Sequence, residues 1–207
     1  MTNKDVSFIA LNDMVYVFDT GDLAKQFDLQ EIPRLLGKEP ALDVTAASKD
    51  DRILGQVRVK AKIELFKDKD FDGRYGYSVI YIDQVVTKRR TWWGWDYYEN
   101  NKYEQNIVSF FRNITSSYRV TLTDGGRLDT SGASTSTGYA KMKFKLRANL
   151  LDDGGPTWKR DVSKNPYFPG NNVDEDSDLS NNRMWGALGL TTWNDEIESL
   201  EIEIVSG

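Results

Sequence analysis

The side chains with the most distinctive chemistry in this chain are the aromatic ones between Lys88 and Tyr103. Six of them are candidates for contact with a ligand or partner: Trp92, Trp93, Trp95, Tyr97, Tyr98 and Tyr103. Rings this dense in a loop can stack on sugars, enter a membrane interface or bury against a partner protein. The preceding Lys88-Arg89-Arg90 would favour an anionic surface. The alternative is that the rings fold back onto the protein, where they would cover the sheet or seal a gap between domains.

Catalytic chemistry is restricted because the chain contains no His and no Cys. It therefore lacks the commonest general base, thiolate ligands and disulfides. A metal would have to be held by oxygen, as calcium and magnesium are. Paired carboxylates of the glycosidase kind remain open because their separation depends on the fold, but no phosphate-binding glycine loop or nucleophile elbow is present. We expect a protein that binds and does not catalyse.

Oxygen-bearing side chains recur in three short motifs, Asp50–Gly55, Arg112–Ser117 and Asn194–Ser199. Each approximates two Asn/Asp residues, two variable residues and then Ser/Thr-Ser, running into a strand. The motifs resemble the closing half of a βγ-crystallin Greek key. Ile63–Arg74, with an acidic turn and Phe-x-Gly, is similar to the opening half, and Met14–Gly21 looks like a looser copy.

Within the opening motif, the physics of a folded-over hairpin assigns a role to two residues. We expect Phe71 to plug the turn and Gly73 to supply a backbone conformation that other residues avoid.

The resemblance implies calcium at the closing motifs, with Asp50–Gly55 paired to Arg112–Ser117 in one domain. The implied metal-site residues are Asp50, Asp51, Asn113, Ser116, Asn194 and Asp195. The motifs also depart from the family pattern. Leu54 and Glu198 replace hydroxyl residues, and Arg112 replaces a leading acidic residue. We therefore expect weak calcium binding or none, and the alternative is that these side chains only cap turns.

Most of the chain carries the pattern of strands, which predicts an all-β protein. Apolar and charged residues alternate in Val57–Leu65, Ala140–Leu150 and Leu200–Ile204. Further β-rich runs are Met14–Phe18, Tyr77–Ile82 and Tyr118–Leu122. The segments with helical character, Leu23–Phe27 and Gln30–Leu36, are too short to dominate the fold.

The small polar residues of Thr123–Gly138 suggest a domain boundary. We expect a βγ-crystallin-like Greek-key β-sandwich in residues 1–123. A second β-sandwich-like unit is expected in residues 124–207, packed on the first or separate from it. Residues 152–182 look irregular, which indicates a functional loop or a hidden element. Their acidic run, Asp174–Asp178, is expected to be solvated, with a bound cation as the alternative.

The net charge of −5 and the pI of about 4.9 argue against a nucleic-acid partner. The chain has no apolar run long enough to span a membrane, and its first residues lack the apolar core of a secretory signal. We expect a cytoplasmic protein, one released by a route without a signal, or one whose signal has been removed.

Together these patterns predict a non-enzymatic binding or structural protein with weak calcium binding. One alternative is a lectin-like or toxin-like protein that contacts a glycan or a membrane through residues 92–103. Another is an assembly component of a larger particle, in which the exposed rings form an oligomer interface.

Overall fold

The computed structural model describes residues 6–11, 14–36, 53–74, 76–107, 111–128, 134–135, 140–148, 151, 156–164, 172–184 and 192–206. The strands are β1 (Ser7–Leu11), β2 (Met14–Phe18), β3 (Ile53–Phe66), β4 (Tyr77–Arg90), β5 (Asp96–Glu99), β6 (Lys102–Asn106), β7 (Ser117–Leu128), β8 (Ser134–Thr135), β9 (Ala140–Arg147), β10 (Thr157–Lys164), β11 (Val173–Asp176) and β12 (Ser199–Ser206). The helices are α1 (Gly21–Gln30), α2 (Ile32–Leu36) and the 3₁₀ turn η3 (Leu179–Asn181).

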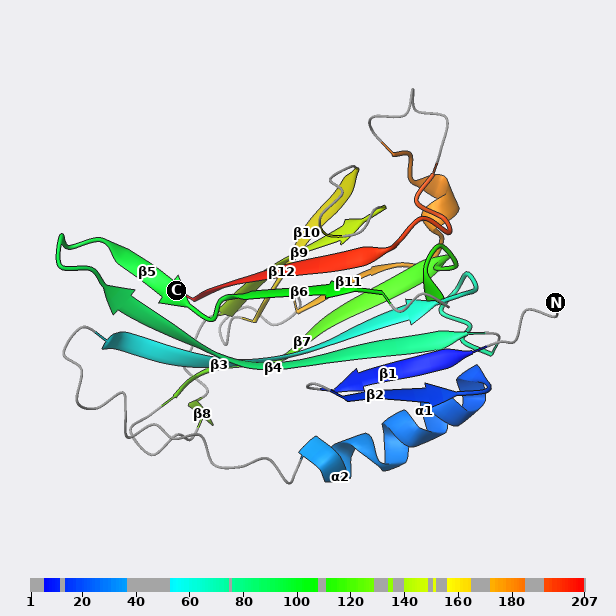
Figure 1. Ribbon diagram of the computed structural model, residues 1–207, viewed down its shortest axis with the longest axis horizontal. Coiled ribbons are helices and arrows are strands. Elements are labelled where there is room, and N and C mark those ends of the chain that lie inside the picture. The colour runs from blue at the N-terminus through cyan, green and yellow to red at the C-terminus, as the bar shows by residue number, and fades with distance from the viewer. Residues whose placement is uncertain are drawn as a thin grey trace.

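The strands form two facing sheets, so the prediction of an all-β, sandwich-like fold is confirmed (Figure 1). The larger sheet has the order β11-β7-β3-β4-β1-β2, with β5 and β8 added beside β4 and β7. The smaller sheet has the order β10-β9-β12-β6. Pairing is antiparallel except between β1 and β4, which run parallel.

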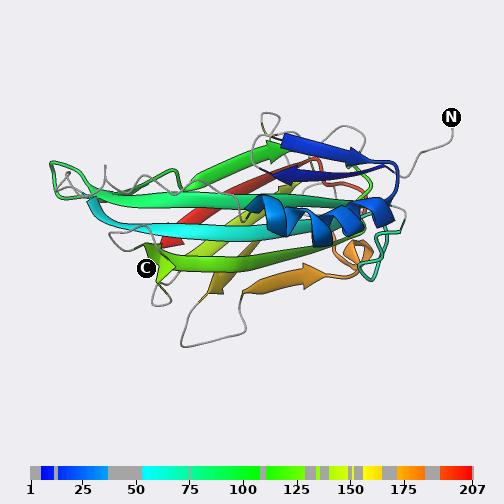
Figure 2. The same cartoon turned by 90° about the horizontal axis from the view of Figure 1, so that it is seen from below.

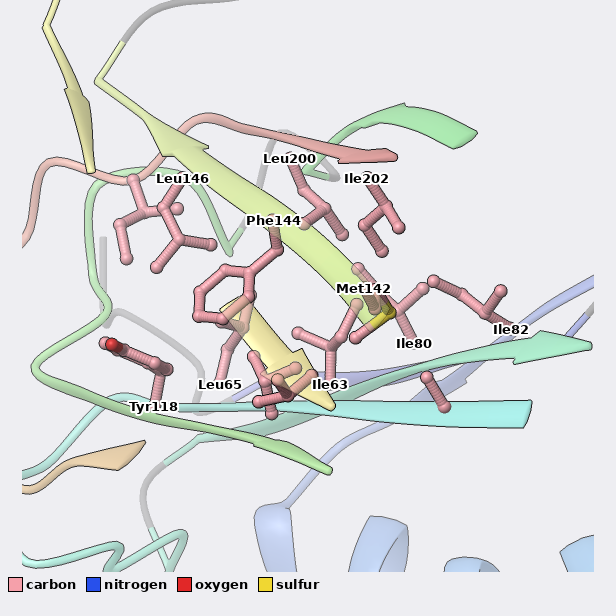
Figure 3. Close-up of a cluster of buried hydrophobic side chains, with 14 of the residues drawn as sticks. Ile63, Leu65, Ile80, Ile82, Tyr118, Met142, Phe144, Leu146, Leu200 and Ile202 are labelled. Atoms are coloured by element: carbon pink, nitrogen blue, oxygen red, sulfur yellow. The ribbon is translucent and has the colours of Figure 1, made fainter. Parts of the chain in front are cut away.

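Alternating side chains explain the core between the sheets. In β3 the predicted inward residues, from Val57 to Leu65, are buried, and the charged residues between them face the other side. Met142, Phe144 and Leu146 of β9 point at β3 from the smaller sheet (Figure 3). The period-2 predictions for these strands are therefore confirmed.

Helix α1 covers the outer face of the larger sheet (Figure 2). It begins after Thr20, whose side-chain oxygen accepts a hydrogen bond from the Leu23 amide at 3.3 Å and so caps the helix. Its Ala24 and Phe27 join a second apolar cluster with residues of β1 and β4. The short predicted helices are thus confirmed, and they form a third layer.

A polar cluster is buried beneath α1, on the charged face of β3. Lys62 Nζ lies 2.7 Å from a carboxylate oxygen of Asp28 and 3.0 Å from one of Glu64. The Tyr77 hydroxyl lies 2.9 Å from Asp28 and 2.8 Å from Glu64, and the Tyr81 hydroxyl donates to Asp28. Burial raises the pKa of both tyrosines, and the nearby carboxylates raise it further, so both hydroxyls stay protonated as donors. The cluster joins α1 to the sheet.

The turn between β3 and β4 corrects one expectation about its residues. Phe71 plugs the turn as expected, with its ring 5.6 Å from that of Phe66. The left-handed residues, however, are Asp70 and Phe71, with φ of 56° and 58°, and Gly73 is not among them. Gly73 matters instead through close approach to α1, because a Cβ on Gly21 would lie 1.7 Å from the Gly73 carbonyl oxygen.

The expected boundary at residue 123 falls inside β7, which continues to Leu128. β6 belongs to the smaller sheet and β11 to the larger one, so strands from both expected units are present in each sheet. One apolar cluster contains residues from Phe8 to Ile204. The two expected units are therefore interleaved around a shared core. Residues 152–182, expected to be irregular, contribute β10, β11 and η3.

No helix in the described part of the chain is both long and apolar enough to cross a bilayer.

Candidate binding sites at the tryptophan tip and the paired turns

The first candidate site is the five-residue loop Thr91–Trp95, which we call the tryptophan tip. It joins β4 to β5, and the two strands pair up to its base, with Arg90 opposite Asp96. On its other side β4 pairs with β3 as far as Arg89. Figure 1 shows this three-stranded ribbon carrying the tip to one end of the molecule.

Hydrogen bonds within the loop fix its shape. The Thr91 amide donates to the Trp95 carbonyl at 2.8 Å, and the Gly94 amide donates to the Thr91 carbonyl at 3.0 Å. The Trp95 amide donates to the Thr91 hydroxyl at 3.0 Å. Gly94 has a φ of 82°, and a Cβ built on it would have no neighbour within 4 Å. The tip is a hydrogen-bonded, convex loop surrounded by open space.

The structure divides the six aromatic candidates into two groups. Trp92, Trp93 and Trp95 are 91%, 83% and 75% exposed, and Tyr97 at the base of the loop is 40% exposed. Tyr98 and Tyr103 are half-buried and pack against the main core. The expectation of a contact surface therefore stays with the three tryptophans, whereas the fold-back alternative describes the last two tyrosines.

The basic residues before the tip are already paired. Arg90 lies 2.9 Å from Asp96, Lys88 lies 3.6 Å from the same carboxylate, and Arg89 lies 2.6 Å from Glu99. The hydrogen bond from Arg90 holds the pKa of Asp96 below its usual value. The electrostatic attraction to anions that was expected of these residues is therefore reduced, and the apolar rings dominate this surface.

The second candidate site is formed by two of the three closing motifs, which meet at one end of the sandwich. Asn113 and Asp195 occupy the same place in each turn, and both are left-handed, with φ of 56° and 58°. The Asn113 amide donates to the Ile197 carbonyl at 3.3 Å, and the Asp195 amide donates to the Thr115 carbonyl at 2.9 Å. The two turns are thus related by an approximate two-fold axis. We call them the paired turns, Arg112–Ser117 and Asn194–Ser199.

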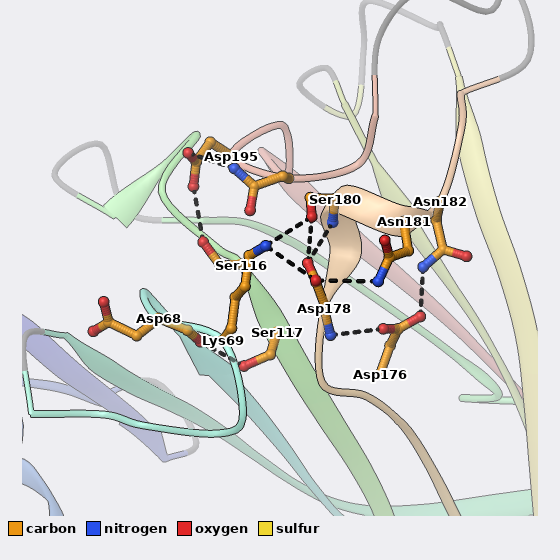
Figure 4. A network of polar contacts seen from close by, with 11 residues as sticks. Asp68, Lys69, Ser116, Ser117, Asp176, Asp178, Ser180, Asn181, Asn182 and Asp195 are labelled. Atoms are coloured by element: carbon orange, nitrogen blue, oxygen red, sulfur yellow. Dashed lines mark hydrogen bonds and ion pairs between the residues drawn. The ribbon is translucent and has the colours of Figure 1, made fainter.

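Side chains repeat this reciprocal arrangement. Ser116 Oγ lies 3.3 Å from Asp195 Oδ1 (Figure 4), and Asn113 Nδ2 donates to Glu198 at 2.7 Å. The fifth residue of each turn therefore meets the second residue of the other. In one half of the pair, Glu198 bonds Asn113 directly and no hydroxyl is present. In the other half, the Ser116 hydroxyl lies beside the Asp195 carboxylate.

The expected partner of Arg112–Ser117 was the first motif, and this pairing is corrected. Asp50 and Asp51 lie outside the described residues, but Ile53 begins β3 while Phe66, at its other end, pairs with Ser117. A strand of this length spans about 40 Å, too far for one shared ion. The structure brings the third motif to Arg112–Ser117 instead. The similarity of the two motifs in the sequence could have indicated that they form a pair. The sequence alone does not show that they meet in the folded protein.

Unsatisfied oxygens and excess negative charge mark the Asp195 half. Among the described residues, neither Asn194 Oδ1 nor Thr115 Oγ1 has a hydrogen-bond partner, and both atoms are buried. Burial raises the pKa of Glu196, and the carboxylates of Asp195 and Glu198 raise it further. No three acidic side chains within the described residues gather as a metal cluster. A cation here would therefore need amide, hydroxyl and carbonyl oxygens as well.

The acidic run Asp174–Asp178 has protein partners. Asp174 accepts a hydrogen bond from Tyr118, and Glu175 pairs with Arg119 at 2.6 Å. Asp178 caps η3 and pairs with Lys69 at 3.0 Å (Figure 4). The first two contacts tie β11 to β7, and the third ties the start of η3 to the turn after β3. The acidic run therefore has a structural role.

Comparison of the chain with protein-family models, with curated proteins and with solved structures found no match. The sites described above are therefore interpreted from their own geometry.

Proposed function

We propose that this protein is a non-enzymatic binding protein that docks on the interfacial region of a lipid bilayer through the tryptophan tip. The observation that carries the proposal is the exposure of Trp92, Trp93 and Trp95, each at least three-quarters exposed on one hydrogen-bonded loop. Exposure of three indole rings to water is unfavourable in free energy, and transfer of the rings to an apolar boundary would remove that cost.

The energetic case rests on the size and amphipathic character of the indole ring. Tryptophan favours the headgroup level of a membrane, where the ring is apolar and its N–H stays wet. If about half of each ring leaves water, the gain is roughly 2 kcal/mol per ring. Three rings give roughly 6 kcal/mol before the cost of immobilisation, enough for reversible docking.

Two features favour a bilayer over a sugar as the partner. A sugar site needs polar groups that converge beside the ring, but Asp96 and Glu99 are occupied by Arg90 and Arg89. The amides of Thr91, Gly94 and Trp95 are bonded within the loop, so the tip can enter a poorly hydrated layer without leaving those donors unpaired.

A variant with Trp92, Trp93 and Trp95 all changed to Ala tests the proposal. We expect its binding to phosphatidylcholine vesicles, measured by co-sedimentation, to fall at least about a hundredfold, because roughly 6 kcal/mol of ring burial is removed. Its melting temperature should stay the same, since the rings are exposed. Leu29→Ala, which removes a 77% exposed apolar side chain from α1, is the matched control and should bind like the wild type.

Equal vesicle binding by the triple variant and the wild type would rule out the bilayer proposal. Loss of glycan binding in that variant, on a glycan panel, would move the function to the lectin-like alternative. Loss of a self-associated form, by mass in solution, would favour the assembly alternative.

Weak calcium binding is a second candidate function. It is supported by Asn194 Oδ1, which lies beside Asp195 and finds no hydrogen-bond partner in the part of the chain that the structure describes. We expect a few millimolar calcium to raise the melting temperature by about 2–5 °C, as a site with a Kd near a millimolar would. Asp195→Asn should remove the shift. Magnesium is the control ion, because it fits flexible oxygen sites poorly. An unchanged melting temperature with calcium would eliminate this candidate.

A further inference from the structure

Strand β2 forms one edge of the larger sheet and carries no charged residue. It pairs with β1 on one side, and no described strand pairs with it on the other. The strands that end the other three sheet edges, β11, β10 and β6, each carry at least two charged residues. Charged side chains on an edge strand hinder its pairing with another chain. Of these four edges, β2 alone lacks that protection.

Both faces of β2 are apolar. Tyr16 and Phe18 face α1, where their ring centroids lie 4.9 and 5.1 Å from that of Phe27. Val15 and Val17 alternate with these two residues, so they point to the other face of the sheet. The valines are 46% and 58% exposed. The strand therefore presents apolar side chains to water beside an edge that no described strand covers.

The exposed valines continue the apolar surface of the main core. Val17 lies opposite Phe8 of β1, and Val15 lies opposite Ala10. Phe8 and Ala10 belong to the main core cluster and are buried. The apolar surface thus changes from buried to exposed between two adjacent strands. A further strand beside β2 would cover the valines and extend the core.

We propose that this edge binds a second copy of the chain, with the two β2 strands antiparallel and related by a two-fold axis at Tyr16. This register places Val15 of each copy opposite Val17 of the other. It also places Met14 opposite Phe18. Cross-strand pairs of β-branched residues, and contacts between a methionine sulfur and an aromatic ring, are both favourable.

A second copy fits this edge because the strand is complementary to itself. A two-fold axis perpendicular to the sheet reverses the direction of the strand and preserves the two faces, so α1 of both copies lies on the same side of the joined sheet. The row from Phe8 to Val17 in one copy then continues through Val15 of the other. The apolar core face is continuous across the axis, and no charged residue of β2 has to leave water.

The dimer is weak and reversible. The strand has five residues, whereas a standard interface has about 20–30 residues a side. Asp19 follows the strand, and Asp13, outside the described residues, precedes it in the sequence. Antiparallel pairing brings the acidic residue before one strand near the one after the other, and like charges repel. We expect a dissociation constant of about 100 µM at low ionic strength, and about threefold tighter association in about 0.5 M sodium chloride.

The test is sedimentation velocity of the full chain between about 5 and 500 µM. We expect the wild type to pass from monomer to dimer, and Val17→Lys to weaken the dimer at least about tenfold because it places a charge on the edge. Val173→Lys adds the same charge to a 42% exposed valine on β11, the other edge of the same sheet, and should associate like the wild type. A monomeric wild type at every concentration, or equal association of Val17→Lys and the wild type, would overturn the proposal.

Association through β2 is separate from the tryptophan tip. The variant that lacks Trp92, Trp93 and Trp95 should therefore form the dimer as the wild type does. Loss of the dimer in that variant would overturn the proposal and favour association through the rings. Because sedimentation uses no vesicles, its outcome is independent of bilayer docking.

Engineered cysteines test the register, because the chain has none of its own. Opposite residues of antiparallel strands are about 4.5–5.5 Å apart at Cα, within the range of a disulfide, whereas diagonal neighbours are about 7–8 Å apart. Under mild oxidation, an equimolar mixture of Val15→Cys and Val17→Cys should form a disulfide between the two variants. This reaction should be at least about fivefold faster than cross-linking of Val15→Cys alone. Equal rates would overturn this pairing of the two strands.

Discussion

The variant Lys62→Met is expected to unfold with a free energy about 3 kcal/mol below that of the wild type at pH 7, measured by urea denaturation. Lys62 is the cation of the polar cluster beneath α1, and Asp28, its closest partner, has a side chain only 4% exposed. Met keeps the apolar stem but leaves Asp28 and Glu64 close together without a cation. Two uncompensated carboxylates in a buried place cost more than the lost contact alone.

Lys60→Met is the matched control for this prediction. It is two residues away on the same face of β3, and its partner Asp83 is also held by Arg58 through two bonds of 2.7 and 2.6 Å. Asp83 therefore keeps its main partner, and the loss should stay below about 1 kcal/mol. If Lys62→Met and Lys60→Met lowered the free energy of unfolding equally, the polar cluster would contribute no more to stability than the surface ion pair of Lys60.

Phe144→Ala is expected to lower the free energy of unfolding by about 3–5 kcal/mol, the usual range for a large ring removed from a core. Phe144 is fully buried between the sheets, with its ring 5.9 Å from that of Tyr118 on the opposite sheet. Since strands from both halves of the chain share this core, we expect one unfolding transition, with far-UV circular dichroism and tryptophan fluorescence shifted together. Lys143→Ala, its exposed neighbour, should change stability by less than about 0.5 kcal/mol.

Two separate transitions, with only one of them moved by Phe144→Ala, would contradict a shared core. That result would instead favour two units that unfold independently, as the polar stretch after Thr123 suggested. A single shifted transition would show that the two sheets are stabilised together.

The strands could be predicted from the sequence because their burial pattern is local. In Val57–Leu65 every second residue is apolar, and the structure buries those residues. The same holds for β9 and β12. Which sheet each strand joins is a matter of distant pairing, so the interleaving of the two halves was not visible. Thr123–Gly138 looked like a linker because its residues are small, yet β7 runs through residue 128.

The paired turns show the same limit at the level of a site. Asn113 and Ser116 were recognised as candidates, but their partners are 85 and 79 residues further along the chain, at Glu198 and Asp195. Spacing within a motif follows from the sequence, whereas contact between motifs depends on where β7 and β12 begin.

The aromatic side chains between Trp92 and Tyr103 were predicted to form a contact surface. Three of the six, the tryptophans, are largely exposed. Ring density alone could not separate Trp92, Trp93 and Trp95 from Tyr98 and Tyr103. The difference is set by the loop that turns at Gly94 and by the return of the chain through β5 and β6 to the core. The exposure of the three tryptophans depends on the path of the backbone, and this path cannot be predicted from the residue composition of the stretch.

The most direct test of bilayer docking is quenching of tryptophan fluorescence by phosphatidylcholine brominated in its acyl chains. Three of the six tryptophans are in the tip, and Trp158 and Trp193 are held near the core. We predict that brominated vesicles quench and blue-shift the wild-type emission and leave the emission of the Trp92, Trp93 and Trp95 to Ala variant unchanged. Wild-type emission that is unaffected by the vesicles, or quenching of equal size in both proteins, would contradict docking through the tryptophan tip.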